Sequence, residues 1–237
     1  MYRAPWWPAD HVPERRLAAH AWLARRGDGT RVVVKAGAAH PVLATLRHPH
    51  LASIIAGGGD WHAAAFVEGR TLAAHLADGA VPQAVALRWM DQLLAALDHL
   101  HAHGLVHRDV QAANVIIDAA ENAVLIDFGL AGAIGPCAVQ GTPASTAPEQ
   151  WRGHAGPGSD VFGAGVLLYR MLAGCHPFPG TPFEAMQRIL LSNYRLHFGL
   201  HFAPLETVTG VVEKALAADP ARRFADAASF RRALANG

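Results

Sequence analysis

The amino-acid sequence predicts an α+β fold with two lobes, a small β-rich N-terminal lobe and a larger, mainly helical C-terminal lobe. Near the N-terminus, the Asp28-Gly29 turn separates two short apolar runs, which is a strong signal for a β-hairpin. After Pro82, apolar residues recur at three- and four-residue steps and predict one long amphipathic helix that ends at Gly104. The chain therefore changes from strand-like to helical in character near residue 70.

The predicted N-terminal lobe contains several short strands and one helix. The hairpin covers Leu17–Ala36, and its β-branched second strand ends in Lys35. Apolar spacing predicts a helix of barely two turns over Pro41–Arg47. Two further strands are predicted at Leu51–Ile55 and Ala63–Val67. Together these elements make a small β-rich lobe with one helix.

The predicted C-terminal lobe is mainly helical, with a few short strands. Besides the long helix, helical runs are predicted at Asp160–Leu172, Pro182–Leu191, Val208–Ala217 and Ala225–Leu234. Short strands are predicted at Val106, Val115–Ile117 and Val124–Ile126. We expect a single domain over residues 1–237, with the N-lobe at about 1–67, a hinge at about 65–70 and the C-lobe at about 71–237.

Composition and charge argue against several classes of function. The 20 Lys and Arg residues nearly balance the 19 Asp and Glu residues, and the net charge of +1 gives no reason to expect a nucleic acid or an anionic membrane as partner. Two cysteines cannot build a disulfide framework, which favours a reducing, cytoplasmic environment. No window approaches the roughly 18 apolar residues of a membrane-spanning helix, and no secretory signal is evident. Most of the 15 histidines lack the spacing of metal ligands.

Three oxygen-bearing side chains carry the clearest chemical signal. Asp109, Asn114 and Asp127 each lie beside a short apolar strand, so the strands bring them together. Carboxylate and amide oxygens are ligands suited to a hard divalent cation such as Mg²⁺. The sequence therefore predicts a site for magnesium and phosphate at this place.

The spacing of these residues resembles that of a known family. A His-Arg-Asp motif at 107–109 leads to Asn114, and an Asp-Phe-Gly motif follows at 127–129, as in the catalytic and magnesium-binding loops of protein kinases. The loop at 141–144 and the ending Asp-Pro-x-x-Arg-Phe at 219–224 are most similar to bacterial serine/threonine kinases of the eukaryotic-like type. The resemblance implies the bilobal kinase fold and covers nearly the whole chain.

The resemblance also implies an activity, the transfer of the γ-phosphoryl group of ATP to Ser or Thr hydroxyls of protein substrates. Asp109 is then the catalytic base, and Asn114 and Asp127 hold Mg²⁺, with Mn²⁺ as the alternative. Lys35 resembles the strand lysine that binds the α- and β-phosphates.

The adenine site is implied to lie at the hinge between the lobes. Backbone groups of Ala65 and Val67 align with those that bind adenine, Glu68 with a group near the ribose, and Ala64 with the gatekeeper behind the base. The other nucleotide contacts implied by the resemblance are Lys35, Gln111, Asn114, Ile116 and Asp127.

Further residues match structural positions of the family. Thr142 lies in the loop that binds the substrate peptide, and Ala147-Pro148-Glu149 resembles its Ala-Pro-Glu anchor. Glu149 is expected to form a buried ion pair with Arg223, and Asp160 resembles a buried aspartate that opens the next helix. These residues are expected to position the substrate loop.

The chain also departs from the family pattern. The segment expected to cover the phosphates, 14–20, has no glycine. Contact of Arg15 or Arg16 with phosphate is one interpretation, and solvated arginines at a strand edge are the favoured one. No acidic residue lies between Lys35 and Asp60, so the lysine must contact Asp127 or the nucleotide. Gln111 replaces the lysine that follows the catalytic aspartate, which weakens charge stabilisation in the transition state.

Two alternatives to an active protein kinase remain open from the sequence. The first is a pseudokinase, a scaffold or nucleotide-binding module without significant turnover, which the departures favour. The second is a small-molecule phosphotransferase similar to aminoglycoside kinases, against which the Ala-Pro-Glu anchor and Arg223 argue.

The segment Leu130–Gln140 contains no Ser, Thr or Tyr, so phosphorylation within it is excluded. The sequence indicates no particular substrate, upstream signal or oligomeric state.

Overall fold

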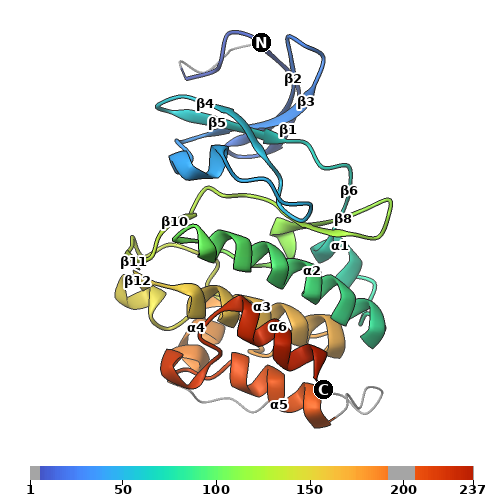
Figure 1. Cartoon of the computed structure of the whole chain (residues 1–237), viewed down its shortest axis with the longest axis vertical. Helices are drawn as coiled ribbons and strands as arrows, with labels where there is room; N and C mark the ends of the chain where they lie inside the picture. The colour runs from blue at the N-terminus through green and yellow to red at the C-terminus, as the bar shows by residue number, and fades with distance from the viewer. Residues whose placement is uncertain (1–5, 192–205, 237) are drawn as a thin grey trace.

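The N-terminal part of the chain forms one antiparallel sheet of five strands in the order β1-β2-β3-β5-β4 (Figure 1). The computed structural model describes residues 6–191 and 206–236, so the first five residues of the predicted N-lobe lie outside it. The strands are β1 (His11–Ala18), β2 (Ala21–Arg26), β3 (Arg31–Ala36), β4 (Ile54–Gly57) and β5 (Trp61–Ala65). The hairpin predicted from the Asp-Gly turn is the β2–β3 pair.

The alternation of side chains in β3 places Lys35 on the face of the sheet turned away from its small core. Val32 and Val34 are fully buried and pack with Ala24 and Ala63. Because successive strand residues point to opposite faces, Lys35 leaves the sheet on the other side. There it meets the C-terminal lobe, as described below.

The helix predicted at 41–47 is wrong, because the structure has only a short 3₁₀ helix, η1 (Pro41–Ala44). The N–H and the hydroxyl of Thr45 both donate to the carbonyl three residues before it, which closes the turn. The guanidinium of Arg47 donates to the carbonyls of Ala44 and Leu46, which a longer helix would need as acceptors for its own N–H groups. Pro49 then follows and disfavours helical backbone in the residue before it.

The two strands predicted after this segment are displaced in opposite directions. The strand predicted at 51–55 is β4, at Ile54–Gly57, because Leu51 pairs with Leu125 of the other lobe instead. The strand predicted at 63–67 is β5, at Trp61–Ala65. The residues beyond it, including Val67, connect the lobes.

The C-terminal lobe is built from helices with small sheets between them, which confirms the predicted α+β class and its two lobes (Figure 1). The helices are α1 (Leu72–Leu76), α2 (Gln83–Ala102), α3 (Pro157–Ala173), α4 (Pro182–Leu190), α5 (Glu206–Ala215) and α6 (Ala227–Ala235). The 3₁₀ helices are η2 (Ala112–Asn114), η3 (Gln150–Arg152) and η4 (Pro220–Arg222).

Short strands connect these helices and position the loops between them. The sheet β6-β8-β9 consists of Gly69–Thr71, Val115–Asp118 and Ala123–Leu125. The two-stranded sheets are β7 (Leu105–Val106) with β10 (Gly132–Ala133), and β11 (Gly135–Pro136) with β12 (His154–Ala155). The segments 107–114 and 126–129 leave these strands side by side, since Ile126 donates its N–H to the Asn114 carbonyl.

Helix α3 is the centre of the C-terminal lobe. It is buried along almost its whole length and packs against α2, α5 and α6. The helix begins at Pro157, so the prediction that Asp160 opens it is corrected by one turn. Two glycines allow neighbours to approach closely: a Cβ on Gly163 would lie 2.9 Å from the Val110 carbonyl, and one on Gly165 would lie 2.9 Å from Ala215.

Gly163→Ala is expected to destabilise the protein by about 1 to 3 kcal/mol, because the added methyl forces Val110 and its backbone out of place. Gly210→Ala is the matched control, since Gly210 lies in α5 with nothing near its Cβ position. That change should stabilise the protein by about 0.4 to 1 kcal/mol. Urea unfolding of both variants measures the difference, and equal effects of the two substitutions would contradict the close packing of α3.

Candidate active site

The loop that carries the candidate base is anchored by Asp160. This carboxylate is completely buried and accepts the backbone N–H groups of His107 and Arg108, each at 2.8 Å. It also accepts Nε2–H of His101 at 2.9 Å. Burial alone would raise the pKa of Asp160, but the hydrogen bond and charge of His101 and the backbone donors outweigh it, so the pKa is lowered. An ionised aspartate therefore fixes the start of the loop.

Two residues next to the candidate chemistry have left-handed backbone. Arg108 has φ of 70° and Asp127 has φ of 66°, a conformation that costs non-glycine residues of order 1 to 3 kcal/mol. The Asp160 carboxylate stabilises the first, because it binds the Arg108 N–H directly. His107 Nε2 lies 3.2 Å from the Ile126 carbonyl, which ties the two strained turns together.

The carboxylate of Asp109 is held by three side-chain donors. Its Oδ2 accepts the amide of Asn114 and the amide of Gln111, both at 2.8 Å. Its Oδ1 accepts the hydroxyl of Thr142 at 3.0 Å. Gln111 also donates to the Thr142 hydroxyl at 2.6 Å, so the loop that carries Thr142 is fastened to the candidate base. A second hydroxyl could approach this carboxylate in the same way as that of Thr142.

An ion pair joins the lobes at the candidate nucleotide site. Lys35 Nζ lies 2.6 Å from Asp127 Oδ2, so the lysine has one of the partners expected from the sequence. Burial alone would raise the pKa of Asp127, but the charge and hydrogen bond of Lys35 and the Gly129 N–H outweigh it, so the pKa is lowered. The carboxylate is therefore ionised at neutral pH.

The donor set around Asp127 fits a divalent cation that is shared with phosphate. The Asn114 nitrogen is committed to Asp109, which leaves its amide oxygen as a ligand. One oxygen of Asp127 has a single N–H donor, from Gly129 at 3.2 Å. Among the described residues no cluster of His, Cys, Asp and Glu could hold a metal by itself. Mg²⁺ is usually held by one or two carboxylates together with substrate phosphates and water.

The hinge residues are partly engaged in the sheet. The Ala65 N–H donates to Ser53 at 2.8 Å and the Phe66 N–H to Arg31 at 3.2 Å, so the predicted adenine contact of Ala65 is limited to its carbonyl. Within the described part of the chain, no acceptor is found for the Val67 N–H. Val67 therefore offers the one hinge N–H among these three for a ligand.

The other residues predicted at the nucleotide site lie around this hinge. Ala64 lies in β5 opposite Val33 and Ile54. Ile116 lies in β8 with a nearly buried side chain. Glu68 is exposed, and its carboxylate is 3.9 Å from the guanidinium of Arg31. The structure therefore places Glu68 near the start of β3 and shows no ribose contact.

The segment expected to cover the phosphates forms the end of β1 and its tight turn into β2. Arg16 donates to the carbonyls of Ala18 and Ala19 at 3.1 and 2.8 Å, and stacks over Trp22. The guanidinium of Arg16 thus makes its contacts within the β1–β2 hairpin, which agrees with the interpretation of Arg16 as a strand-edge residue.

Two contacts at the site carry little sequence signal. His101, which binds Asp160, lies in the last turn of α2, where only its polar character on a mostly apolar helix distinguishes it. Gln150 donates to the Arg108 carbonyl at 2.9 Å, directly after the Ala-Pro-Glu segment. Both connect elements that are far apart in the sequence.

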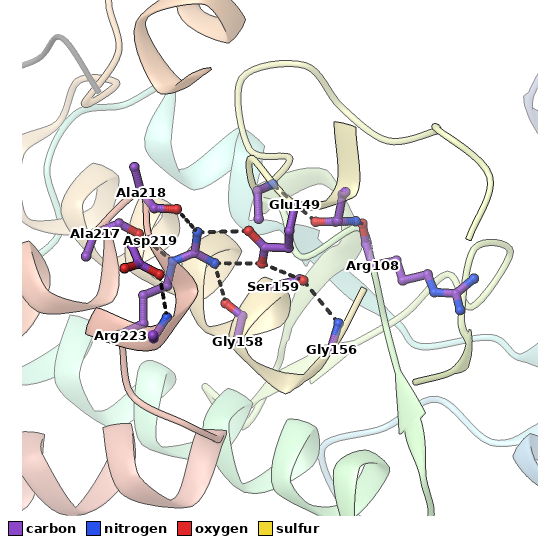
Figure 2. Close-up of polar contacts among 12 residues, drawn as sticks. Arg108, Glu149, Gly156, Gly158, Ser159, Ala217, Ala218, Asp219 and Arg223 are labelled. Carbon is purple, nitrogen blue, oxygen red and sulfur yellow. Dashed lines mark hydrogen bonds and ion pairs between the residues drawn. The ribbon is translucent and has the colours of Figure 1, made fainter. Parts of the chain in front are cut away.

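Glu149 and Arg223 form the ion pair expected from the sequence (Figure 2). It is bidentate, with N–O distances of 2.8 and 2.9 Å, and the Arg223 side chain is completely buried. Ser159 donates to Glu149 at 2.7 Å, and the guanidinium also donates to carbonyls of Gly158, Ala217 and Ala218. The pair thus fixes the end of the substrate loop to α3 and to the segment before η4.

Arg223→Met is expected to cost about 3 to 5 kcal/mol of stability, because it leaves the Glu149 carboxylate without its cation. The double variant Glu149→Leu with Arg223→Met should lose less than the sum of the two single changes. Arg231→Met is the control, since Arg231 pairs with Asp91 at the surface and should contribute less than about 1 kcal/mol. Urea unfolding compares them, and a cost of Arg223→Met no larger than that of Arg231→Met would refute the anchoring role.

Known proteins are similar to this chain over most of its length. A serine/threonine-protein kinase of Corynebacterium efficiens is 35% identical over 184 residues, which cover 71% of this chain and 34% of that protein. The hormonally up-regulated neu tumor-associated kinase of Mus musculus is 38% identical, over 65% of this chain and 22% of its own length. CBL-interacting serine/threonine-protein kinase 5 of Arabidopsis thaliana is 32% identical, over 70% and 39%.

The chain therefore spans between 22% and 39% of the length of these relatives. They come from a bacterium, an animal and a plant, so they do not establish a bacterial origin. The family model described as protein kinase domain matches residues 42–234, which include Asp109, Asn114 and Asp127 but not Lys35. From this match, together with the geometry of the loops, the chain belongs to the protein kinase domain family.

Proposed function

We propose that this domain transfers the γ-phosphoryl group of ATP to Ser or Thr hydroxyls of protein substrates. The observation that carries the proposal is the carboxylate of Asp109, which already accepts a hydroxyl hydrogen bond from Thr142 at 3.0 Å. Two relatives are named as serine/threonine kinases, which supports the activity over a pseudokinase scaffold. Glu149 and Arg223 support a peptide substrate, because they fix the loop that carries Thr142.

Asp109 acts as the base in this proposal. The substrate hydroxyl donates to its carboxylate, which orients the oxygen toward the phosphoryl group and accepts the proton. Asn114 and Gln111 hold the carboxylate in place. Gln111 supplies amide donors but no positive charge, so the transition state is stabilised less than it would be by a lysine.

In this proposal ATP and a divalent cation would bind where Lys35 meets the loops at 107–114 and 127–129. Lys35 binds phosphate oxygens, and the Asn114 and Asp127 oxygens hold Mg²⁺, or Mn²⁺ in its place. A cation held there would neutralise charge on the phosphates. Around the adenosine, we assign the Ala65 carbonyl, the Val67 N–H, Glu68 and Ile116. The Val67 N–H, for which residues 6–191 and 206–236 provide no acceptor, supports the assignment of the hinge.

The domain limits and location belong to the same proposal. We assign residues 1–237 to one kinase domain, with the N-lobe at about 1–67, the hinge at about 65–70 and the C-lobe at about 71–237. We assign a bacterial source and the cytoplasm from the sequence. No helix in residues 6–191 or 206–236 is long and apolar enough to cross a membrane.

The activity is tested by transfer of radiolabelled phosphate to a panel of basic proteins. Asp109→Asn is expected to lower the transfer rate about 10²-fold or more, because the base is lost. It should keep the thermal shift produced by ATP and Mg²⁺, whereas Lys35→Met should weaken that shift. Asp91→Asn, at an exposed aspartate, is the control and should transfer like the wild type. Transfer by the wild type no higher than by Asp109→Asn would refute the proposal in favour of a scaffold.

Gln111→Lys is expected to raise kcat about tenfold or more. The new ammonium replaces the amide donor to Asp109 and adds a cation beside the transferred phosphoryl, an interaction of a few kcal/mol. Gln111→Ala, which supplies neither donor nor charge, should be slower than the wild type. Steady-state rates at saturating ATP measure both, and a Gln111→Lys variant no faster than the wild type would contradict the role of this position.

A further inference from the structure

A cavity of about 140 Å³ lies between the substrate loop and α3. Its lining includes the polar residues Gln111, Thr142, Arg170 and His176 and the apolar residues Val166 and Leu167. A single buried water needs only about 10 to 15 Å³ of such space. The cavity is therefore large enough for the polar end of a side chain.

The cavity adjoins the candidate base. Gln111 and Thr142 line it and at the same time contact the carboxylate of Asp109, at 2.8 and 3.0 Å. A peptide whose hydroxyl lies at Asp109 would thus pass the opening of the cavity. A neighbouring side chain of that peptide can reach into it.

Arg170 gives the cavity a positive charge that the described residues do not balance. It lies in the last turn of α3 and is only partly exposed. Among the residues that the structure describes, no carboxylate lies within ion-pair distance of its guanidinium and no acceptor binds it. Burial lowers the pKa of Arg170, which reflects the cost of removing an unpaired cation from water.

His176 does not add a second charge. Burial and the nearby Arg170 lower its pKa to about 4, so the ring is neutral at physiological pH. Its Nδ1 accepts the Phe178 N–H at 3.1 Å, which places the ring proton on Nε2. The described lining contains no acidic side chain. The cavity therefore combines one cation with neutral hydrogen-bonding groups.

We infer that this cavity is a specificity subsite that binds an anionic side chain of the protein substrate, close to the residue that is phosphorylated. The inference rests on the proposed kinase activity. A carboxylate of Glu or Asp, or the phosphate of a phosphoserine, supplies the negative counter-charge for the Arg170 guanidinium and forms charge-assisted hydrogen bonds with it. A lysine or arginine at the same place is repelled, and an apolar side chain leaves the guanidinium unpaired.

Binding of short alanine-based peptides to the full chain tests this subsite without need of turnover. Each peptide carries a fluorophore, one central serine, and a Glu, phosphoserine, Ala or Lys at one flanking position. At one position the wild type should bind the Glu or phosphoserine peptide about tenfold tighter than the Ala peptide. A gain with Glu assigns a carboxylate, and a gain with phosphoserine alone assigns a phosphate.

Variants of Arg170 connect this preference to the cavity. Arg170→Gln should bind the anionic and Ala peptides equally, and Arg170→Glu should prefer the Lys peptide. Arg88→Glu, at an exposed arginine of α2 that does not line the cavity, should keep the wild-type preference. The inference would be overturned if the wild type bound the anionic, Ala and Lys peptides with equal affinity. It would also be overturned if Arg170→Gln still bound the anionic peptides more tightly than the Ala peptide.

Thermal stability and phosphate transfer distinguish a substrate subsite from a purely structural role of Arg170. Arg170→Gln should melt at the wild-type temperature or above it, because the neutral amide relieves an unpaired cation; a Tm lower by several degrees would assign Arg170 the structural role. Phosphate transfer to the same peptides separates the two proposals. Transfer without a flanking-charge preference refutes only the subsite, whereas Arg170-dependent binding without transfer refutes the kinase activity and leaves an anion-binding site.

Discussion

The buried carboxylate of Asp160 holds the loop on which the proposed chemistry depends. It binds two consecutive backbone N–H groups, at His107 and Arg108, and the ring of His101. These contacts offset the strain of the left-handed Arg108, which in turn sets the direction of Asp109. Because Asp160 belongs to α3, the most buried helix, the position of the base is fixed by the packing of the whole C-terminal lobe.

The nucleotide side of the site works with fewer polar groups than the family pattern provides. The segment after β3 folds only into η1 and carries no acid, so the charge of Lys35 is taken up by Asp127 itself. The same carboxylate is the proposed metal ligand. One ion pair of 2.6 Å thus links the N-terminal sheet to the proposed metal-binding loop, and the charge of Lys35 helps to lower the pKa of Asp127.

Two arginines on the substrate side illustrate opposite solutions to the burial of charge. Arg223 is completely buried, and its guanidinium is compensated by the Glu149 carboxylate and by the carbonyls of Gly158, Ala217 and Ala218 (Figure 2). Arg170 is partly buried beside a cavity and has no such compensation among the described residues. The first is therefore a structural clamp on the substrate loop, whereas the second is suited to an anion that arrives with the substrate.

The sequence by itself determined the fold class, the long helix α2 and the loops at 107–114 and 127–129, because these rest on periodicity and fixed spacing. The family resemblance implied the pair of Glu149 with Arg223, whereas the sequence left the partner of Lys35 open between Asp127 and the nucleotide. It did not determine η1, where side chains of Thr45 and Arg47 take the carbonyls that a helix needs. Nor did it reveal the contact of His101 with Asp160, or that Arg170 has no counter-ion among the described residues. Whether a buried polar group has a partner depends on residues far apart in the chain, and only the tertiary structure decides that.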